Sequence, residues 1–239
     1  VAQVCAQAGI PTVAVKATPG STDKIRSGLE KSLAKMVERQ KMSAELRDST
    51  LGLLQFTTDE SAVADCDLIV ESIIEDIDIK KAMFQRLEGI VSPQTIIATN
   101  TSTLSVTALM AVCKQRDRVA GLHFFNPAPV MKLVEIIHGF ETSDEVISTL
   151  DEFCKKVGKD PVIVQDTTGF IVNRLLMPMI NEAIYTLYEG VGTVDGIDTA
   201  MRLGANHPMG PLELGDFIGL DTVLSIMNVL YEGLADSKY

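Results

Sequence analysis

The stretch Asp67-Leu68-Ile69-Val70-Glu71-Ser72-Ile73-Ile74 contains the short apolar run of a strand that is buried on both faces of a sheet. A helical pattern from Ile79 to Ile90 follows, in which Met83 and Leu87 recur at the spacing of one buried face. A second apolar strand then spans Thr95 to Ala98. This strand–helix–strand order predicts an α/β fold with a doubly wound, mostly parallel sheet.

The same alternation extends along the chain in both directions. We expect further strands at residues 12–15, 119–125, 133–137 and 161–164, and helices at residues 1–8, 21–41 and 143–157. After Gly169 only helical patterns appear, at residues 170–188, 194–203 and 212–234. We therefore predict a Rossmann-like domain over residues 1–167, followed by an all-helical domain over residues 168–239.

Charge and cysteine content exclude several classes of protein. The net charge of -11 argues against a nucleic-acid partner, because phosphate backbones are bound by clustered Lys and Arg side chains. The sequence has no run of 18 or more apolar residues, so we expect no membrane span, and it shows no signal peptide. Four cysteines lie far apart without a CxxC pair, which indicates reduced thiols and no metal site.

Two ionisable residues interrupt apolar strands. His123 lies in the segment Gly121 to Pro127, and Glu135 follows in the segment Leu133 to Ile137. A single histidine in a strand is more often a structural core residue. However, burying either group alone is costly, so two such groups on neighbouring strands are expected to pair. A carboxylate that orients an imidazole suits it for general-base catalysis. His138 and His207 have no similar companion, and we interpret them as surface or structural residues.

Other polar residues stand where this architecture binds ligands. Asn100, Thr101 and Ser102 follow an apolar strand, at the carboxyl end where doubly wound sheets hold ligands. They could equally cap a helix, and both roles are compatible. Asn173 and Arg174 interrupt an apolar helix near the domain junction. They could belong to a solvent-exposed face of that helix or to a binding site.

Taken together, these segments resemble the short-chain 3-hydroxyacyl-CoA dehydrogenase family, which includes the 3-hydroxybutyryl-CoA dehydrogenases. Seven stretches match in family order: Asn100–Ser102, Gly121–Pro127, Pro129–Glu135, Gly169–Arg174, Asp198–Met201, Pro208–Pro211 and Gly219–Thr222. The resemblance implies an NAD-dependent enzyme of fatty-acid or butanoate metabolism. Its substrate would be an acyl-CoA thioester, and it would form a homodimer through the helical domain.

The resemblance also implies a role for each matching residue. His123 would be the general base, Glu135 would orient it, and Ser102 and Asn173 would hydrogen-bond the reacting oxygen atoms of the substrate. The surroundings of the cofactor would include Glu75, Lys80, Asn100, Ser102 and Asn126. On the helix after the first predicted strand, Ser32 and Arg39 would contact CoA.

The chain departs from the family pattern in three ways. It contains no GxGxxG sequence, so we expect the family's first strand and glycine-rich phosphate turn to precede Val1. The acidic residue expected after residues 12–15 is replaced by Lys16 or Ala17, which leaves NADP open as the cofactor. We also expect the helical domain to continue past Tyr239.

Two alternative functions remain open at this stage. The chain could belong to a dehydrogenase for free 3-hydroxy acids, or to a non-catalytic NAD-binding relative. We expect a cytoplasmic location for a bacterial protein. The mitochondrial matrix or another organelle stays open, because we expect the natural N-terminus to be missing.

Overall fold

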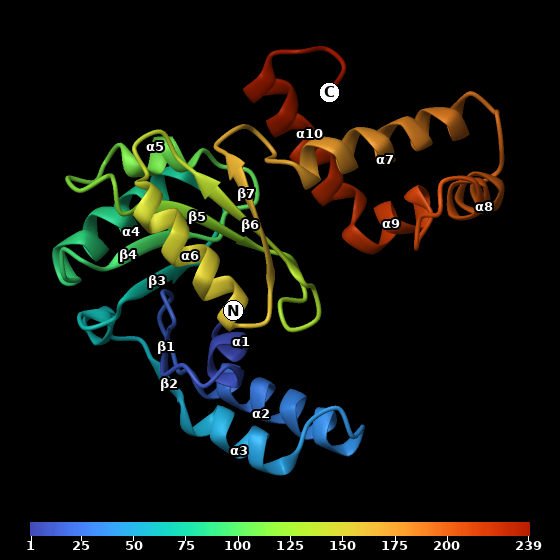
Figure 1. The fold of residues 1–239 in the computed structure, drawn as a ribbon. Coiled ribbons are helices and arrows are strands. Elements are labelled where there is room, and N and C mark those ends of the chain that lie inside the picture. Colours follow the sequence, from blue (N-terminus) through green and yellow to red (C-terminus); the bar gives the residue numbers. More distant parts are fainter. The chain divides into compact units, whose positions relative to one another are not determined.

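The computed structural model describes residues 1–239, which form two units. The first unit comprises residues 1–101 and 105–166, and the second comprises residues 102–104 and 167–239. Figure 1 traces the elements of both units in chain order. Each unit is described by itself.

The first unit is built on seven strands in two sheets. The strands are β1 (Thr12–Val15), β2 (Leu54–Thr57), β3 (Leu68–Glu71), β4 (Ile96–Thr99), β5 (Val119–Phe124), β6 (Leu133–His138) and β7 (Asp160–Gln165). β1 and β2 form a two-stranded parallel sheet, and the others form a five-stranded sheet in the order β3-β4-β5-β6-β7. All neighbours are parallel except β5 and β6, which are antiparallel. The α/β prediction is confirmed, although the strands are divided between two sheets and β6 and β7 run opposite to β3, β4 and β5.

Helices cover both faces of the five-stranded sheet. The helices of this unit are α1 (Ala2–Gln7), α2 (Asp23–Glu38), α3 (Ala44–Gly52), α4 (Ile77–Ile90), α5 (Val106–Met110) and α6 (Asp144–Lys156), with the short 3-10 helix η1 (Glu60–Val63). Leu122 and Phe124 of β5 pack with Leu150 and Cys154 of α6 in one apolar cluster. Because side chains alternate along a strand, His123 points to the opposite face, where α5 contacts β5.

Several local expectations are met by the structure. β1 has the predicted bounds, and Ser143 caps α6 by accepting a hydrogen bond from the amide of Val146. Gly9, which follows α1, has a positive φ of 79°. The apolar pattern of residues 21–41 does form a helix, but only Leu33 of its apolar residues is fully buried.

The second unit contains four helices and no strand. These are α7 (Val172–Tyr188), α8 (Val194–Gly204), α9 (Pro211–Ile218) and α10 (Leu220–Leu234). Met177 and Ile180 of α7 pack against Val223, Met227 and Leu230 of α10 to form its core. An all-helical unit was predicted and is observed.

The single helix expected over residues 212–234 is wrong. The chain turns at Gly219, whose φ is 97°, and α9 and α10 meet at 96°. Such a φ is accessible to glycine at little cost, so the apolar pattern continues through a residue at which the helix ends. No single helix has the length and apolar composition to cross a bilayer. The α9–α10 pair would pass by length and composition only.

Candidate active site

His123 and Glu135 form a buried pair across two strands. The antiparallel register of β5 and β6 places the two residues directly opposite each other. His123 Nδ1 lies 2.8 Å from Glu135 Oε2, and the residues are 4% and 1% exposed. The contact expected from the sequence is therefore present. Because Glu135 is buried, its carboxylate requires a hydrogen-bond donor.

This contact selects one tautomer of the imidazole. A carboxylate accepts a hydrogen bond, so the ring proton resides on Nδ1 and the lone pair on Nε2. The ring of Phe125 lies 4.4 Å from the imidazole, centroid to centroid, at an angle of 46°. The carboxylate and the neighbouring ring together restrict rotation of His123. A histidine held in this way can take up a proton at Nε2 in a fixed direction.

Asn100 is fixed from both sides at the end of β4. Its backbone amide donates to the carbonyl of Glu71 at 2.7 Å, and its side-chain Oδ1 accepts from the amide of Phe124 at 2.8 Å. Because Oδ1 is engaged by a backbone donor, the side-chain NH2 is the group that Asn100 can offer to a ligand. Asn100 lines the large cavity described below.

A buried ionic cluster follows β3. Lys80 Nζ lies 2.7 Å from Glu71 Oε1 and 3.4 Å from Glu75 Oε2, and it donates to the carbonyl of Ile73. The Thr99 hydroxyl donates to the other oxygen of Glu71 at 2.8 Å. Glu71 is absent from the residues predicted for the site. A carboxylate inside an otherwise apolar strand was the available signal, because a buried charge requires a partner.

Thr101 and Asn126 are two further polar residues that follow strands of this unit, β4 and β5. Thr101 donates a hydrogen bond to Glu75, which connects the end of β4 to the ionic cluster. Asn126 follows β5 and precedes a loop whose carbonyls at Ala128 and Met131 accept hydrogen bonds from Lys159. Burial and the neighbouring Lys132 lower the pKa of the Lys159 ammonium. Asn126 lines the cavity.

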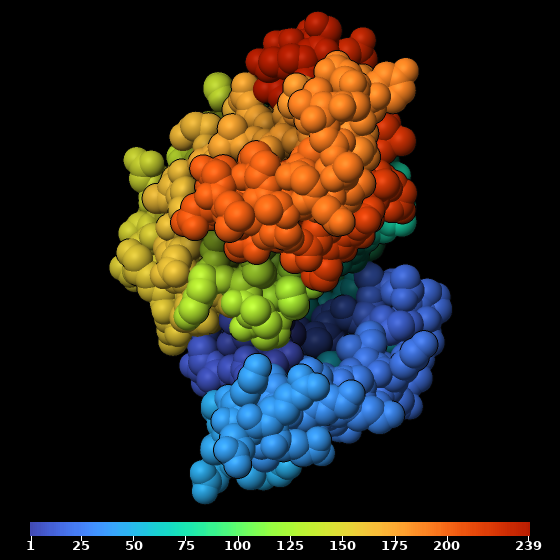
Figure 2. All heavy atoms as spheres, turned by 90° about the vertical axis from the view of Figure 1, so that its right-hand side faces the viewer, coloured from blue at the N-terminus to red at the C-terminus, as the bar shows by residue number.

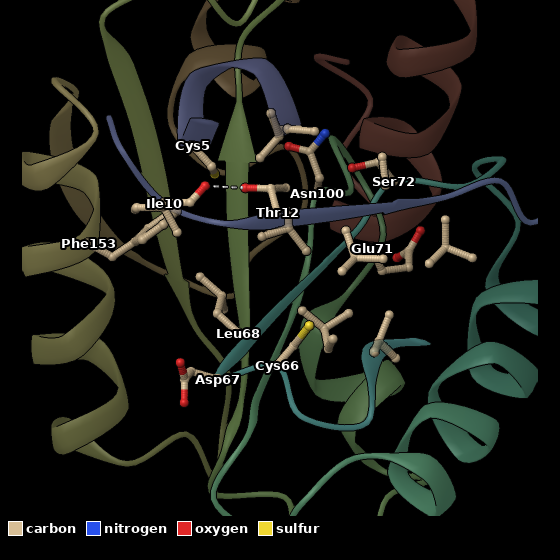
Figure 3. A pocket seen from close by; sticks show the side chains of 18 of the residues that line it. Cys5, Ile10, Thr12, Cys66, Asp67, Leu68, Glu71, Ser72, Asn100 and Phe153 are labelled. Atoms are coloured by element: carbon tan, nitrogen blue, oxygen red, sulfur yellow. Dashed lines mark hydrogen bonds between the residues drawn. The ribbon is translucent and has the colours of Figure 1, made fainter. Parts of the chain in front are cut away.

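A cavity of about 1290 Å³ lies between the two sheets of the first unit. β1 lines one side and β3 another. Each of these strands pairs with another strand along one edge only, β1 with β2 and β3 with β4. Figure 3 shows Glu71, Ser72 and Asn100 gathered at this cavity, with Cys5 and Thr12 nearby. In the space-filling view the surface is hollowed between the blue segment that contains α2 and the lime-green segment that follows β5 (Figure 2).

These residues fit the nicotinamide half of a dinucleotide. A fixed amide, Asn100, and an ion pair, Lys80 with Glu71, stand at the carboxyl ends of β4 and β3, where doubly wound sheets bind ligands. The turn that would hold a pyrophosphate is not part of the sequence, which contains no GxGxxG.

Ser102 and Asn173 meet within the helical unit. The Asn173 side-chain amide donates to the carbonyl of Ser102 at 3.1 Å, and Asn173 is buried in the first turn of α7. Gly169 precedes this turn with a φ of 77°, and a Cβ there would lie 2.5 Å from Leu230 Cδ2. The positive φ favours glycine at this position, directly before the first turn of α7 that carries Asn173.

Ser32 and Arg39, predicted to contact CoA, stand apart from the cavity. Ser32 is exposed on α2 and Arg39 is exposed directly after it. Neither residue lines the cavity. No group of three or more His, Cys, Asp or Glu side chains is arranged to hold a metal ion.

Sequence comparison assigns both parts of the chain. The profile of the 3-hydroxyacyl-CoA dehydrogenase NAD-binding domain matches residues 1–167, and that of the C-terminal domain matches residues 169–239. The chain belongs to the 3-hydroxyacyl-CoA dehydrogenase family. The resemblance inferred from seven short motifs is thus confirmed over nearly the whole chain.

Individual members of the 3-hydroxyacyl-CoA dehydrogenase family are close in sequence. A 3-hydroxybutyryl-CoA dehydrogenase of Bradyrhizobium diazoefficiens is 47% identical over 242 residues, which covers 100% of this chain and 82% of that protein. The mitochondrial hydroxyacyl-coenzyme A dehydrogenase of Rattus norvegicus is 44% identical over 97% of this chain and 76% of its own length.

The fold of the family is equally evident in solved structures. The (S)-3-hydroxybutyryl-CoA dehydrogenase of Ralstonia eutropha has a TM-score of 0.96 and 42% identity, covering 100% of this chain and 84% of that one. An M. tuberculosis structure matches with the same TM-score at 37% identity and the same coverage.

Proposed function

We propose that this chain oxidises a short-chain 3-hydroxyacyl-CoA to the 3-ketoacyl-CoA, or catalyses the reverse reduction, with NAD as the hydride carrier. The observation that carries the proposal is the buried contact of 2.8 Å between His123 and Glu135. Membership of the 3-hydroxyacyl-CoA dehydrogenase family and the fixed Asn100 side chain at the carboxyl end of β4 support it.

His123 is the general base in this proposal. Its Nε2 takes the proton of the 3-hydroxyl group as the hydride leaves C3 of the substrate, and in the reverse direction it returns that proton to the 3-keto oxygen. Glu135 keeps the other ring nitrogen protonated and stabilises the imidazolium that forms. The nicotinamide, when bound, supplies the hydride chemistry, and the protein positions and polarises the reacting groups.

The remaining polar residues position the two ligands. Ser102 and Asn173 hydrogen-bond the reacting oxygen atoms, and the Asn173 amide also orients the Ser102 segment through its carbonyl. Around the nicotinamide, Asn100 and Asn126 offer amides, and Glu75 with Lys80 forms a charged rim. Ser32 and Arg39 form a separate, exposed contact for CoA. Such an exposed site suits the long anionic part of CoA better than the reacting thioester.

We also infer that the cavity between β1 and β3 is where a further parallel strand and the phosphate-binding turn of this family would lie. Two strand edges without partners line it, and a strand that paired with both edges would join the two sheets. In this proposal residues 1–167 bind the nucleotide, and residues 168–239 contribute to substrate binding and to a homodimer.

Steady-state kinetics test the substrate class. We expect the protein at its natural length to reduce acetoacetyl-CoA with NADH, and to turn over free acetoacetate far more slowly. Faster turnover of the free acid would favour a 3-hydroxy acid dehydrogenase instead. Tight NADH binding without turnover of any thioester would indicate a non-catalytic relative.

A further inference from the structure

The carboxyl end of β1 carries a lysine and no carboxylate. Residues 16–22, which connect β1 to α2, contain no acidic side chain, and the first one is Asp23 in the first turn of α2. In doubly wound dinucleotide-binding domains, an acidic residue in this region binds the ribose 2′-hydroxyl, and a basic one accommodates a 2′-phosphate. Lys16 therefore bears on which of the two nucleotides the site accepts.

Lys16 is held in a defined position. Its backbone amide donates to the carbonyl of Thr57 at 2.9 Å, which extends the pairing of β1 with β2 by one residue. Its Nζ donates to the carbonyl oxygens of Thr18 at 2.8 Å and Pro19 at 2.5 Å, with Gly20 at 3.4 Å. The ammonium thus lies inside the turn that follows β1, and the residues on either side of it, Val15 and Ala17, line the cavity.

The charge of Lys16 is balanced only by neutral carbonyls. Lys16 takes part in none of the ion pairs of the structure. The carboxylates that follow the neighbouring strand β2 have other partners: Asp59 accepts from the amide of Ser61, and Glu60 pairs with Arg86 at 3.2 Å. A phosphate is a stronger partner than a carbonyl, because its negative charge adds a Coulomb attraction to the hydrogen bond that the ammonium donates.

We infer that Lys16 makes the site accept a 2′-phosphorylated nucleotide, so that the protein binds NADPH with an affinity similar to that for NADH. This inference rests on the proposed function. The ammonium of Lys16 exchanges a carbonyl partner for the 2′-phosphate. The phosphate then lies near the amino-terminal end of the 16-residue helix α2, whose dipole favours an anion, whereas Asp23 in its first turn opposes one. Arg26, stacked on Phe56 at 5.4 Å in the first turns of α2, adds a second positive charge.

Nucleotide titration, followed by the fluorescence of the reduced nicotinamide, tests this inference without turnover. For the protein at its natural length we expect dissociation constants for NADPH and NADH that agree within about tenfold, a difference of about 1.4 kcal/mol. Lys16→Asp should weaken NADPH binding at least about tenfold, while NADH binding stays equal or tightens. Added salt should weaken NADPH binding more than NADH binding, because it screens the extra charge.

Two further variants separate the charge of Lys16 from its effect on the turn. Lys16→Met keeps most of the length of the side chain and removes its charge, so it should weaken NADPH binding selectively. Lys114→Asp makes the same charge change as Lys16→Asp at an exposed site after α5, and should leave the ratio of the two dissociation constants unchanged.

The outcomes distinguish this inference from the proposed function. NADH binding at least about 100-fold tighter than NADPH binding, a difference of about 2.7 kcal/mol, would overturn the inference and leave the proposed function intact. Equal weakening of both nucleotides in Lys16→Met would also overturn it, because the lysine would then only hold the turn. Binding of neither nucleotide would overturn the proposed function and this inference together.

Discussion

The Lys80 ammonium lies 2.7 Å from Glu71 Oε1, and the two side chains are 1% and 2% exposed. The pair joins α4 to β3, and hydrogen bonds to Ile73 and Thr99 complete it. Removing one partner of a buried ion pair leaves the other charged without compensation, which typically costs about 3–5 kcal/mol.

We therefore expect Lys80→Met to lower the free energy of unfolding by about 3–5 kcal/mol, measured by urea denaturation. The neighbouring Lys81→Met, at a half-buried position of the same helix, should change it by less than about 1 kcal/mol. Adding Glu71→Leu to Lys80→Met should recover part of the loss, because the fully buried carboxylate is then removed together with its partner. A loss below about 1 kcal/mol in Lys80→Met would contradict this description of the cluster.

Asp198 of α8 stabilises the start of α9. Its two carboxylate oxygens accept from the amides of Leu212 at 2.9 Å and Glu213 at 3.0 Å, and the N-cap residue Gly210 has no side chain to do so. Asp198→Ala should destabilise the protein by about 1–2 kcal/mol, as loss of a helix cap does. Thermal unfolding measures the effect, with the exposed Asp195→Ala on the same helix as the control. Equal melting temperatures for the two variants would refute the capping role.

Cys154 should be unreactive in the folded protein. Burial raises the pKa of its thiol from 9.0 to about 12, with the nearby Asp151 adding to the effect. The thiolate is the reactive form, so iodoacetamide at pH 8 should modify the partly exposed Cys66 first and Cys154 only after unfolding. Mass spectrometry of the alkylated protein identifies the sites. Early modification of Cys154 would show that the apolar cluster beneath α6 opens readily.

The sign of this shift also fixes a pH dependence. Because the pKa of Cys154 is higher in the folded protein than in the unfolded chain, its contribution to stability is complete below pH 9 and declines as the pH rises toward about 12. A Cys154→Ala variant should lose less stability than the unmodified protein over that range. A decline of the same steepness in both would assign the loss to other groups.

An apolar surface on α9 and α10 supports the proposed homodimer. Phe217 is 75% exposed and Leu224 is 62% exposed, and a contiguous patch formed by such side chains is typical of an interaction surface. Phe217→Asp should shift the protein from dimer to monomer in sedimentation experiments. Phe140→Asp replaces an equally exposed phenylalanine of the first unit and should leave the oligomeric state unchanged. A dimer that persists in Phe217→Asp would exclude this surface as the interface.

Local signals in the sequence predicted much of the fold and the central pair of the site. The strand from Thr12 to Val15 depends on neighbours in sequence, and it is observed with the predicted bounds. The His123–Glu135 contact was also predictable, because two charged groups on adjacent apolar strands can be buried only together.

Features that depend on packing escaped prediction. β2 (Leu54–Thr57) alternates apolar and polar residues over only four positions, too few to separate a strand from a loop. Glu71 was read as part of an apolar run, although it is the partner of Lys80. The break between α9 and α10 lies inside a continuous apolar pattern, and a single glycine with positive φ decides it. The grouping of Ser102 with the helical unit has no signal in the local sequence.

The most direct test of the account is the turnover number of His123→Ala in acetoacetyl-CoA reduction at saturating NADH. We predict a fall of about 10²–10⁴-fold, a smaller fall in Glu135→Gln, and near-normal turnover in His138→Ala. A His123→Ala enzyme that keeps a near-normal turnover number would contradict the account, because proton transfer would then not depend on the imidazole that Glu135 orients.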